Sequence, residues 1–84
     1  MRLVFTANGW TDYRHRVEND RTMLRRVTPL IEATLRDPST RIGKPELLRG
    51  NFAGYWSRRI DEEHRLVYML DGDDVVVIGA RHHY

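Results

Sequence analysis

The stretch YWSRRIDEEHRLVYMLDGDDVVVIGAR, residues 55–81, predicts three β-strands joined by two short polar turns. β-branched and aromatic residues are frequent in the extended segments, whereas acidic residues and a glycine fill the turns. Asp71-Gly72 is a strong hairpin signal, because a primed turn needs a positive φ. We therefore expect strands over Tyr55–Ile60, Arg65–Leu70 and Val75–Arg81, with turns at Asp61–His64 and Asp71–Asp74.

A short strand and a first helix are predicted ahead of these strands. Arg2–Thr6 is a β-type run, and residues 7–9, Ala-Asn-Gly, predict a turn. Trp10, Tyr13 and Val17 then follow a three-then-four spacing, which places them on one helical face. We expect this face, including Trp10, to pack into the core.

A second, longer helix is predicted between Asp20, which can cap its N-terminus, and Asp37-Pro38, which ends it. Its apolar stripe consists of Met23, Leu24, Val27, Leu30, Ile31, Thr34 and Leu35. Pro29 lies within the stripe, where a proline removes a backbone hydrogen bond at a cost of about 3 kcal/mol. We expect a kink and no break, because the stripe stays in phase across it.

The order of the elements predicts an α+β fold. Two N-terminal helices would cover one face of a mainly antiparallel twisted sheet, and the polar segment Ser39–Pro45 would connect the two halves. With 84 residues we expect a single domain, 1–84, that buries roughly 60 to 65% of its unfolded surface. There is no cysteine and no window near the roughly 18 apolar residues of a membrane span, so we expect a cytoplasmic protein with no membrane partner.

Side chains alternate between the two faces of a strand, which predicts the composition of each face. The rows that we expect to face the helices are Trp56 and Ile60; Leu66, Tyr68 and Leu70; and Val76, Ile78 and Ala80. The charged residues that we then expect on the open face are Arg59, Arg65, Arg81 and His83. His82 would fall on the opposite face.

This concentration of arginines predicts an anion-binding surface. Any one of them could be an ordinary solvent-facing charge, but like charges on neighbouring strands destabilise a sheet, and Glu46 is one of few acidic residues near them in our reading. Arginine bonds two phosphate oxygens at once and stays charged. Tyr55 and Tyr84 would add stacking surfaces for unpaired bases. The set therefore favours phosphate or RNA.

Neither histidine-rich nor aspartate-rich segment predicts a metal site. His82 and His83 would point to opposite faces without a third ligand nearby in sequence. The DGDD segment at 71–74 does not match the spacing of a calcium loop. We expect no metal and no other cofactor.

Three segments of the chain closely resemble the YoeB (Txe) family, a branch of the RelE/ParE toxin superfamily. They are GKPELL at 43–48, NFAGYWSRRIDEEHRLVY at 51–68 and RHHY at 81–84. The similarity extends over essentially the whole chain, with two departures: His82, where relatives often have tyrosine, and Pro29. The resemblance implies a compact α+β ribonuclease that cleaves mRNA in the A site of the 70S ribosome and is neutralised by a YefM-type antitoxin.

The resemblance also implies roles for single residues. Glu46 would be the general base, Arg65 the main transition-state stabiliser and His83 the general acid, a chemistry that needs no metal. Arg59 and Tyr84 would be supporting residues that bind RNA or phosphate, with Lys44 and Arg58 as weaker candidates for RNA contact. Arg81 joins this set from its expected place on the open face. Operator DNA would be bound only through the antitoxin complex, and a homodimer is left open.

Two other functions remain open. One is a toxin of the same superfamily that acts by binding, like the gyrase-directed ParE branch. The other is a small nucleic-acid-binding or antitoxin-like module without toxicity. Glu46 and His83 discriminate among them, because a protein that only binds has no need of an acid and a base.

Overall fold

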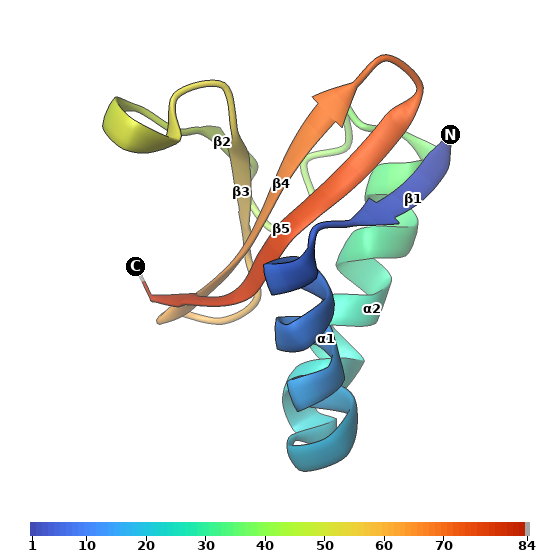
Figure 1. The fold of residues 1–84 in the computed structure, drawn as a ribbon, viewed down its shortest axis with the longest axis vertical. Coiled ribbons are helices and arrows are strands. Elements are labelled where there is room, and N and C mark those ends of the chain that lie inside the picture. The colour runs from blue at the N-terminus through green and yellow to red at the C-terminus, as the bar shows by residue number, and fades with distance from the viewer. Residues whose placement is uncertain (84) are drawn as a thin grey trace.

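Two helices pack against one side of a five-stranded sheet (Figure 1). The computed structural model describes residues 1–83, with the backbone alone at residues 82 and 83. In chain order the elements are β1 (Arg2–Phe5), α1 (Ala7–Asn19), α2 (Arg21–Arg36), β2 (Glu46–Leu47), the short 3-10 helix η1 (Gly50–Phe52), β3 (Trp56–Arg59), β4 (His64–Asp71) and β5 (Asp74–His83). This arrangement confirms the predicted α+β class.

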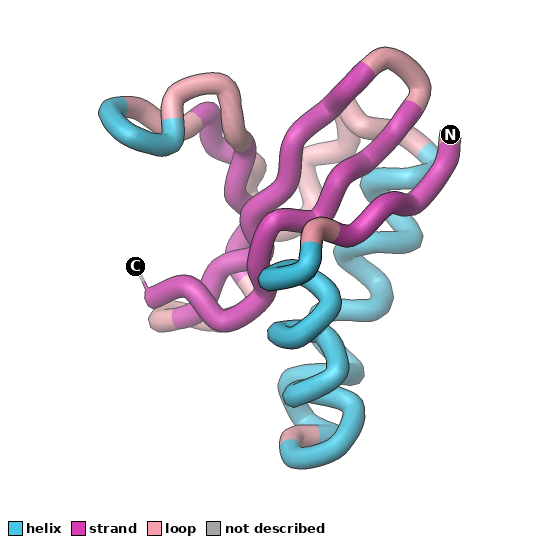
Figure 2. Tube along the Cα trace, in the orientation of Figure 1, coloured by secondary structure: helices cyan, strands magenta, loops and turns pink. Residues whose placement is uncertain are grey.

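The sheet has the strand order β1-β5-β4-β3-β2. β1 runs parallel to β5, and the other three pairs are antiparallel (Figure 2). The predicted hairpin joins β4 to β5, with Asp71 opposite Asp74 and with Gly72 at a φ of 57°. Among the described residues, no helix is long and apolar enough to cross a membrane.

The core lies between α2 and the sheet. Its buried cluster consists of Met23, Val27, Leu30, Ile31, Ile60, Leu66, Tyr68, Val75, Val77 and Ala80. Asp20 caps α2 as predicted, because its Oδ1 accepts a hydrogen bond from the backbone N–H of Met23 at 3.1 Å. The helix continues through Pro29, which lies on its exposed side.

The prediction for the buried face of α1 was partly wrong: Tyr13 packs against the core as expected, but Trp10 and Val17 are exposed. Trp10 is 50% exposed and contacts Phe5 and Tyr13 at the surface, whereas Gly9 and Arg16 are buried. Gly9 belongs to the helix and not to a preceding turn, because α1 begins at Ala7. A Cβ atom at Gly9 would overlap the carbonyl oxygen of Val77, so the missing side chain lets α1 approach β5 closely.

The predicted faces were right for β3 and for Leu66 and Tyr68 of β4, but Leu70 is exposed, and the prediction for β5 was partly wrong. Leu66 and Tyr68 are core residues, and Trp56 packs against them. In β5, however, Val75 and Val77 face the core together with Ala80, so the row changes between Val77 and Ala80. The cause is the register shift between Val67 and Tyr68, whose partners are Gly79 and Val77, because it breaks strict alternation at this point of β5.

Candidate active site

The centre of the candidate active site is a chain of three polar side chains across β2, β3 and β4. Glu46 lies opposite Ser57, and Ser57 lies opposite Val67, two residues from Arg65. Nη1 of Arg65 is 3.2 Å from Oγ of Ser57 and 3.5 Å from Oε2 of Glu46. The predicted proximity of Glu46 and Arg65 is therefore present in the structure.

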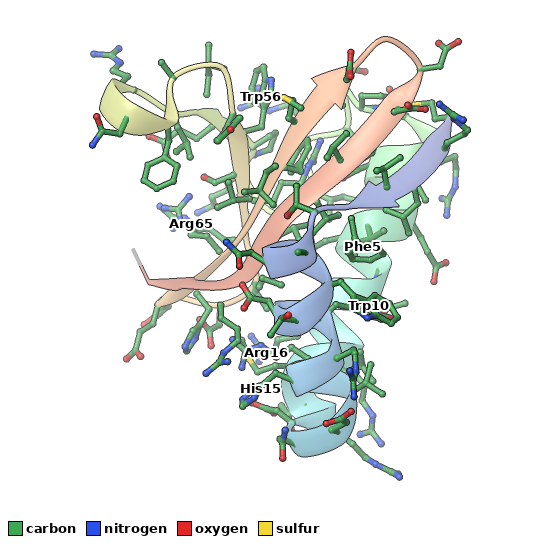
Figure 3. The ribbon with its side chains drawn as sticks, viewed as in Figure 1. Phe5, Trp10, His15, Arg16, Trp56 and Arg65 are labelled. Carbon is green, nitrogen blue, oxygen red and sulfur yellow. The ribbon has the colours of Figure 1, made fainter. Side chains whose placement is uncertain are left out.

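Arg65 and Glu46 differ sharply in exposure. Arg65 is only 3% exposed, although Figure 3 shows it on the side of the sheet away from the helices. The side chain of Glu46 is 53% exposed. Because a buried charge is costly without partners, the contacts with Ser57 and Glu46 help to hold the guanidinium in place. The arrangement presents a reachable carboxylate beside a fixed cation.

Arg59 and Lys44 lie at the margin of this group. Arg59 is exposed and directly opposite Arg65, as predicted, so two arginines neighbour each other across β3 and β4. Its backbone N–H donates a hydrogen bond to the carbonyl of Gly43 at 2.6 Å. This bond ties the end of β3 to the loop that carries Lys44, which is exposed and has a φ of 50°.

Arg58 has a different position from the one that RNA contact requires. It is fully buried, with Nε donating to Oη of Tyr68 at 2.8 Å. Its other nitrogens donate to the carbonyl oxygens of Pro38, Thr40 and Ile42 at 2.7 to 3.0 Å. The guanidinium is occupied in joining the loop after α2 to the sheet, so we no longer assign Arg58 to RNA.

Arg81 does not share a face with Arg65. It is exposed and lines a pocket beside α1, together with Thr11, Arg14, His15, Glu18 and Asn19. The prediction that alternation would bring Arg81 beside Arg65 was wrong, because the register shifts come between them.

The end of β5 nevertheless runs beside the candidate site. Its backbone pairs His82 with Arg65 and His83 with His64. The side chains of His82 and His83, and the whole of Tyr84, lie outside the described residues. The roles expected of His83 and Tyr84 therefore stay predictions.

The turn before β4 is held by a carboxylate. Oδ1 of Asp61 accepts hydrogen bonds from the backbone N–H groups of Glu63 and His64, and its carboxylate also contacts Nδ1 of His64 at 3.0 Å. Burial raises the pKa of Asp61, but these hydrogen bonds outweigh it and leave the pKa below its ordinary value. Asp61 thus fixes the start of the strand that carries Arg65.

Sequence reasoning missed three side chains near the site. Ser57 was given no role. Asp12 and Arg16 of α1 hydrogen-bond to the backbone of Ala80 in β5, and their i, i+4 spacing was the only available signal. Among the described residues, no group of three His, Cys, Asp or Glu side chains converges in a way that could hold a metal ion.

Comparison with known proteins points to one family. Residues 5–84 match the family model described as "YoeB-like toxin of bacterial type II toxin-antitoxin system". The toxin YoeB of Streptomyces coelicolor is 51% identical over 84 residues, covering 100% of both chains. A YoeB/ParE toxin from Agrobacterium tumefaciens is 44% identical with a TM-score of 0.91 and full coverage of both chains. A chain of the heterotetrameric YoeB-YefM complex from Staphylococcus aureus is 35% identical with a TM-score of 0.87, covering 100% of this chain and 98% of that one.

Proposed function

This chain belongs to the YoeB-like toxins of bacterial type II toxin-antitoxin systems, and from this premise we propose that it is a ribosome-dependent endoribonuclease. It cleaves mRNA in the ribosomal A site by attack of a 2′-hydroxyl on the adjacent phosphodiester. One observation carries the proposal: the exposed carboxylate of Glu46 lies 3.5 Å from the buried guanidinium of Arg65.

The exposed position of Glu46 suits a general base. A base must come within about 2.6 to 3.2 Å of the proton that it takes, so the carboxylate has to be accessible to the 2′-hydroxyl. Glu46 lies in the two-residue strand β2, which is one of the two edge strands of the sheet. RNA can therefore reach it without entering the core.

The buried position of Arg65 suits a stabiliser of the transition state. A cation that is already fixed costs little reorganisation when negative charge builds up on the phosphoryl oxygens. Ser57 and Glu46 both accept from Nη1 of Arg65, which restricts the direction of its guanidinium. When the scissile phosphate binds, Arg65 contacts the phosphoryl oxygens while Glu46 receives the proton.

The remaining roles concern the acid and the RNA contacts. His83 donates the proton to the leaving 5′-oxygen, and the products are a cyclic 2′,3′-phosphate and a 5′-hydroxyl end. Arg59 and Lys44, both exposed, bind the RNA backbone, and Tyr84 supports the reacting nucleotide. Arg81 lies toward α1, so it binds the RNA backbone farther from the scissile phosphate.

The proposed partners follow from the family. A YefM-type antitoxin neutralises the toxin, in line with the YoeB-YefM complex from Staphylococcus aureus. Operator DNA is bound only through that complex. The chain acts as a single domain in the cytoplasm, and whether it forms a homodimer is a question for sedimentation analysis.

Cleavage of a defined message on purified ribosomes tests the proposal. The wild-type chain should cut within the A-site codon, and Glu46→Gln should reduce the single-turnover rate by a factor on the order of 100 or more. Glu32→Gln is the matched control, because Glu32 is an exposed carboxylate on α2.

Two outcomes would contradict the proposal. Equal rates for Glu46→Gln and the wild type would remove the carboxylate from the mechanism. Growth inhibition without RNA cleavage, and unaffected by Glu46→Gln or His83→Gln, would favour a toxin that acts by binding.

A further inference from the structure

Two side chains of α1 hold both backbone polar groups of one residue in β5. Oδ2 of Asp12 accepts a hydrogen bond from the N–H of Ala80 at 3.0 Å. Nε and Nη2 of Arg16 donate to the carbonyl oxygen of Ala80 at 3.3 and 3.2 Å. Nη1 of Arg16 also contacts Asp20 at 3.3 Å. The bonds to Ala80 link residues 64 to 68 positions apart in the chain.

The contacts of Arg16 with Ala80 are buried and that of Asp12 is partly buried, so they are not ordinary surface pairs. Ala80 is completely buried and Arg16 is 5% exposed. Figure 3 shows Arg16 on the flank of α1 near the end of β5. A guanidinium in this position has taken the place of an apolar residue on the buried face of the helix. Because buried backbone groups must be paired, the two side chains favour a particular course of β5 at Ala80.

The contacts lie at the place where the β4–β5 register shifts. The pairing runs Val67 with Gly79 on one side of the shift and Arg65 with His82 on the other. Ala80 and Arg81 together therefore span the single residue Leu66, which is the geometry of a β-bulge. Continued without a shift, the Val67–Gly79 register would have set Arg65 opposite Arg81.

We propose that Asp12 and Arg16 are positioning residues that fix the C-terminal register of β5 and thereby set His82, and not Arg81, across from Arg65. This inference rests on the proposed function, because it concerns the same site. Two arginines facing each other would repel, and the histidines would be one residue out of place. Neither side chain touches the reacting atoms; both act through the backbone of Ala80.

The test combines cleavage kinetics with two register measurements on the full chain. Asp12→Ala and Arg16→Met should lower kcat by a factor on the order of 10 to 100, as misplacement of catalytic groups does, with little change in KM. Asp12→Asn keeps an acceptor oxygen and should stay within about threefold of the wild type. Arg14→Ala is the matched control, because it breaks an i, i+4 ion pair with Glu18 on the same helix without touching Ala80.

The register is followed independently of activity. In Asp12→Ala the amide proton of Ala80 should exchange at least about tenfold faster, while those of the core strands are unchanged. The cross-strand nuclear Overhauser effect between the backbones of Arg65 and His82 should weaken or be lost. If Asp12→Ala does not fold, Arg16→Lys serves instead, because it keeps the charge but offers one donor group where Arg16 uses two nitrogens.

The outcomes separate the two proposals. Loss of kcat together with loss of the Arg65–His82 contact, and recovery of both in Asp12→Asn, is the expected result. An unchanged register in Asp12→Ala and Arg16→Met, or a changed register with full activity, would overturn the inference. If the wild-type chain cleaves no RNA, the proposed function fails, while the exchange and Overhauser measurements still decide whether the two side chains set the register.

Discussion

Arg58 is a buried cation whose guanidinium is shared among four oxygen atoms of the protein. It donates to Oη of Tyr68 and to the carbonyl oxygens of Pro38, Thr40 and Ile42. Replacing it with methionine keeps much of the volume but leaves these acceptors without their donor. Hydrogen bonds to charged groups contribute roughly 1.5 to 3 kcal/mol each. Removing the buried charge also removes the cost of taking it out of water, which offsets part of this loss. We therefore expect Arg58→Met to lower the free energy of unfolding by about 2 to 3 kcal/mol.

Urea unfolding measures this loss, with a lower midpoint and an unchanged slope as the expected pattern. Arg25→Met, at an exposed position of α2, is the control and should change little. A stable Arg58→Met protein that has lost RNA cleavage would return Arg58 to the RNA-binding set.

The same substitution has a spectroscopic consequence at Tyr68. Burial raises the pKa of the Tyr68 phenol, while the charge and hydrogen bond of Arg58 oppose that rise. We therefore expect Arg58→Met to raise the pKa of Tyr68 further, as measured by ultraviolet titration of tyrosinate. The pKa of Tyr68 in the folded protein lies above its unfolded value of about 10. The neutral phenol therefore contributes stability below a pH of about 10, and this contribution is lost as the pH rises through the folded pKa.

At the scale of elements, the contact between α1 and β5 depends on a missing side chain. Alanine normally stabilises a helix by about 1 kcal/mol relative to glycine. At Gly9 the added Cβ would overlap the carbonyl oxygen of Val77, so the helix would have to move away from β5. We expect Gly9→Ala to destabilise the protein by about 2 kcal/mol, opposite in sign to the helix propensity.

Thermal unfolding of Gly9→Ala beside Asn8→Ala, its exposed neighbour, checks this sign. An increase in Tm for Gly9→Ala would show that α1 can shift without cost. Activity should fall as well, because the same helix carries Asp12 and Arg16.

The pairing of β1 with β5 begins at an ion pair that gives a pH signal. Nε and Nη2 of Arg2 donate to the two carboxylate oxygens of Asp74 at 2.8 and 2.9 Å. The hydrogen bonds from Arg2 are the main cause of a lowered pKa of Asp74. Burial opposes this shift, and the positive charge of Arg2 adds to it. We expect Arg2→Gln to return this pKa toward its ordinary value.

The sign of the stability effect follows from the direction of the shift. Because the folded pKa is lowered, the pair contributes stability above the unfolded value of about 3.9, and the contribution is lost as the pH falls through the folded value. Carboxyl chemical shifts of Asp74 across this range, with Arg21→Gln as control, test the prediction. An identical titration curve in Arg2→Gln would mean that the pair does not persist in solution.

The elements show how far the sequence could predict the fold and the site. The ends of α2 were predictable because Asp20 caps the helix and its apolar residues form one long stripe. The faces of β5 were not predictable, because Val75 and Val77 are as apolar as Val76 and Ile78. No pattern in the sequence indicated the register shifts. α1 was misjudged for the opposite reason: its buried face is built from a glycine and an arginine, which hydrophobic periodicity does not detect.

For the whole molecule, the candidate site draws on segments from both halves of the chain. Glu46, Ser57 and Arg65 come from neighbouring strands, and their proximity follows from local pairing. The end of β5 reaches the same place, but α1 at the other end of the sequence holds it there through Ala80. The arrangement of the candidate site is therefore a property of the whole fold and not of the three-stranded segment alone.

This organisation predicts different effects of additions at the two ends of the chain. The N-terminal strand β1 forms one edge of the sheet, whereas the candidate site lies toward the opposite edge at β2, and Figure 1 shows the start of β1 far from the end of β5. The backbone of β5 pairs with Arg65 at His82, two residues before Tyr84. Extra residues after Tyr84 should therefore obstruct RNA or disturb the proposed acid, and the same residues before Met1 should not.

We expect the C-terminal extension to reduce cleavage on ribosomes by a factor on the order of 10 or more, and the N-terminal one to change it little. Both proteins should unfold at the same temperature and bind the antitoxin, which limits the difference to the site. Equal cleavage rates for the two extended proteins would show that the end of β5 takes no part in the proposed catalysis. Glu46 and Arg65 would then be the residues that remain in the proposed mechanism.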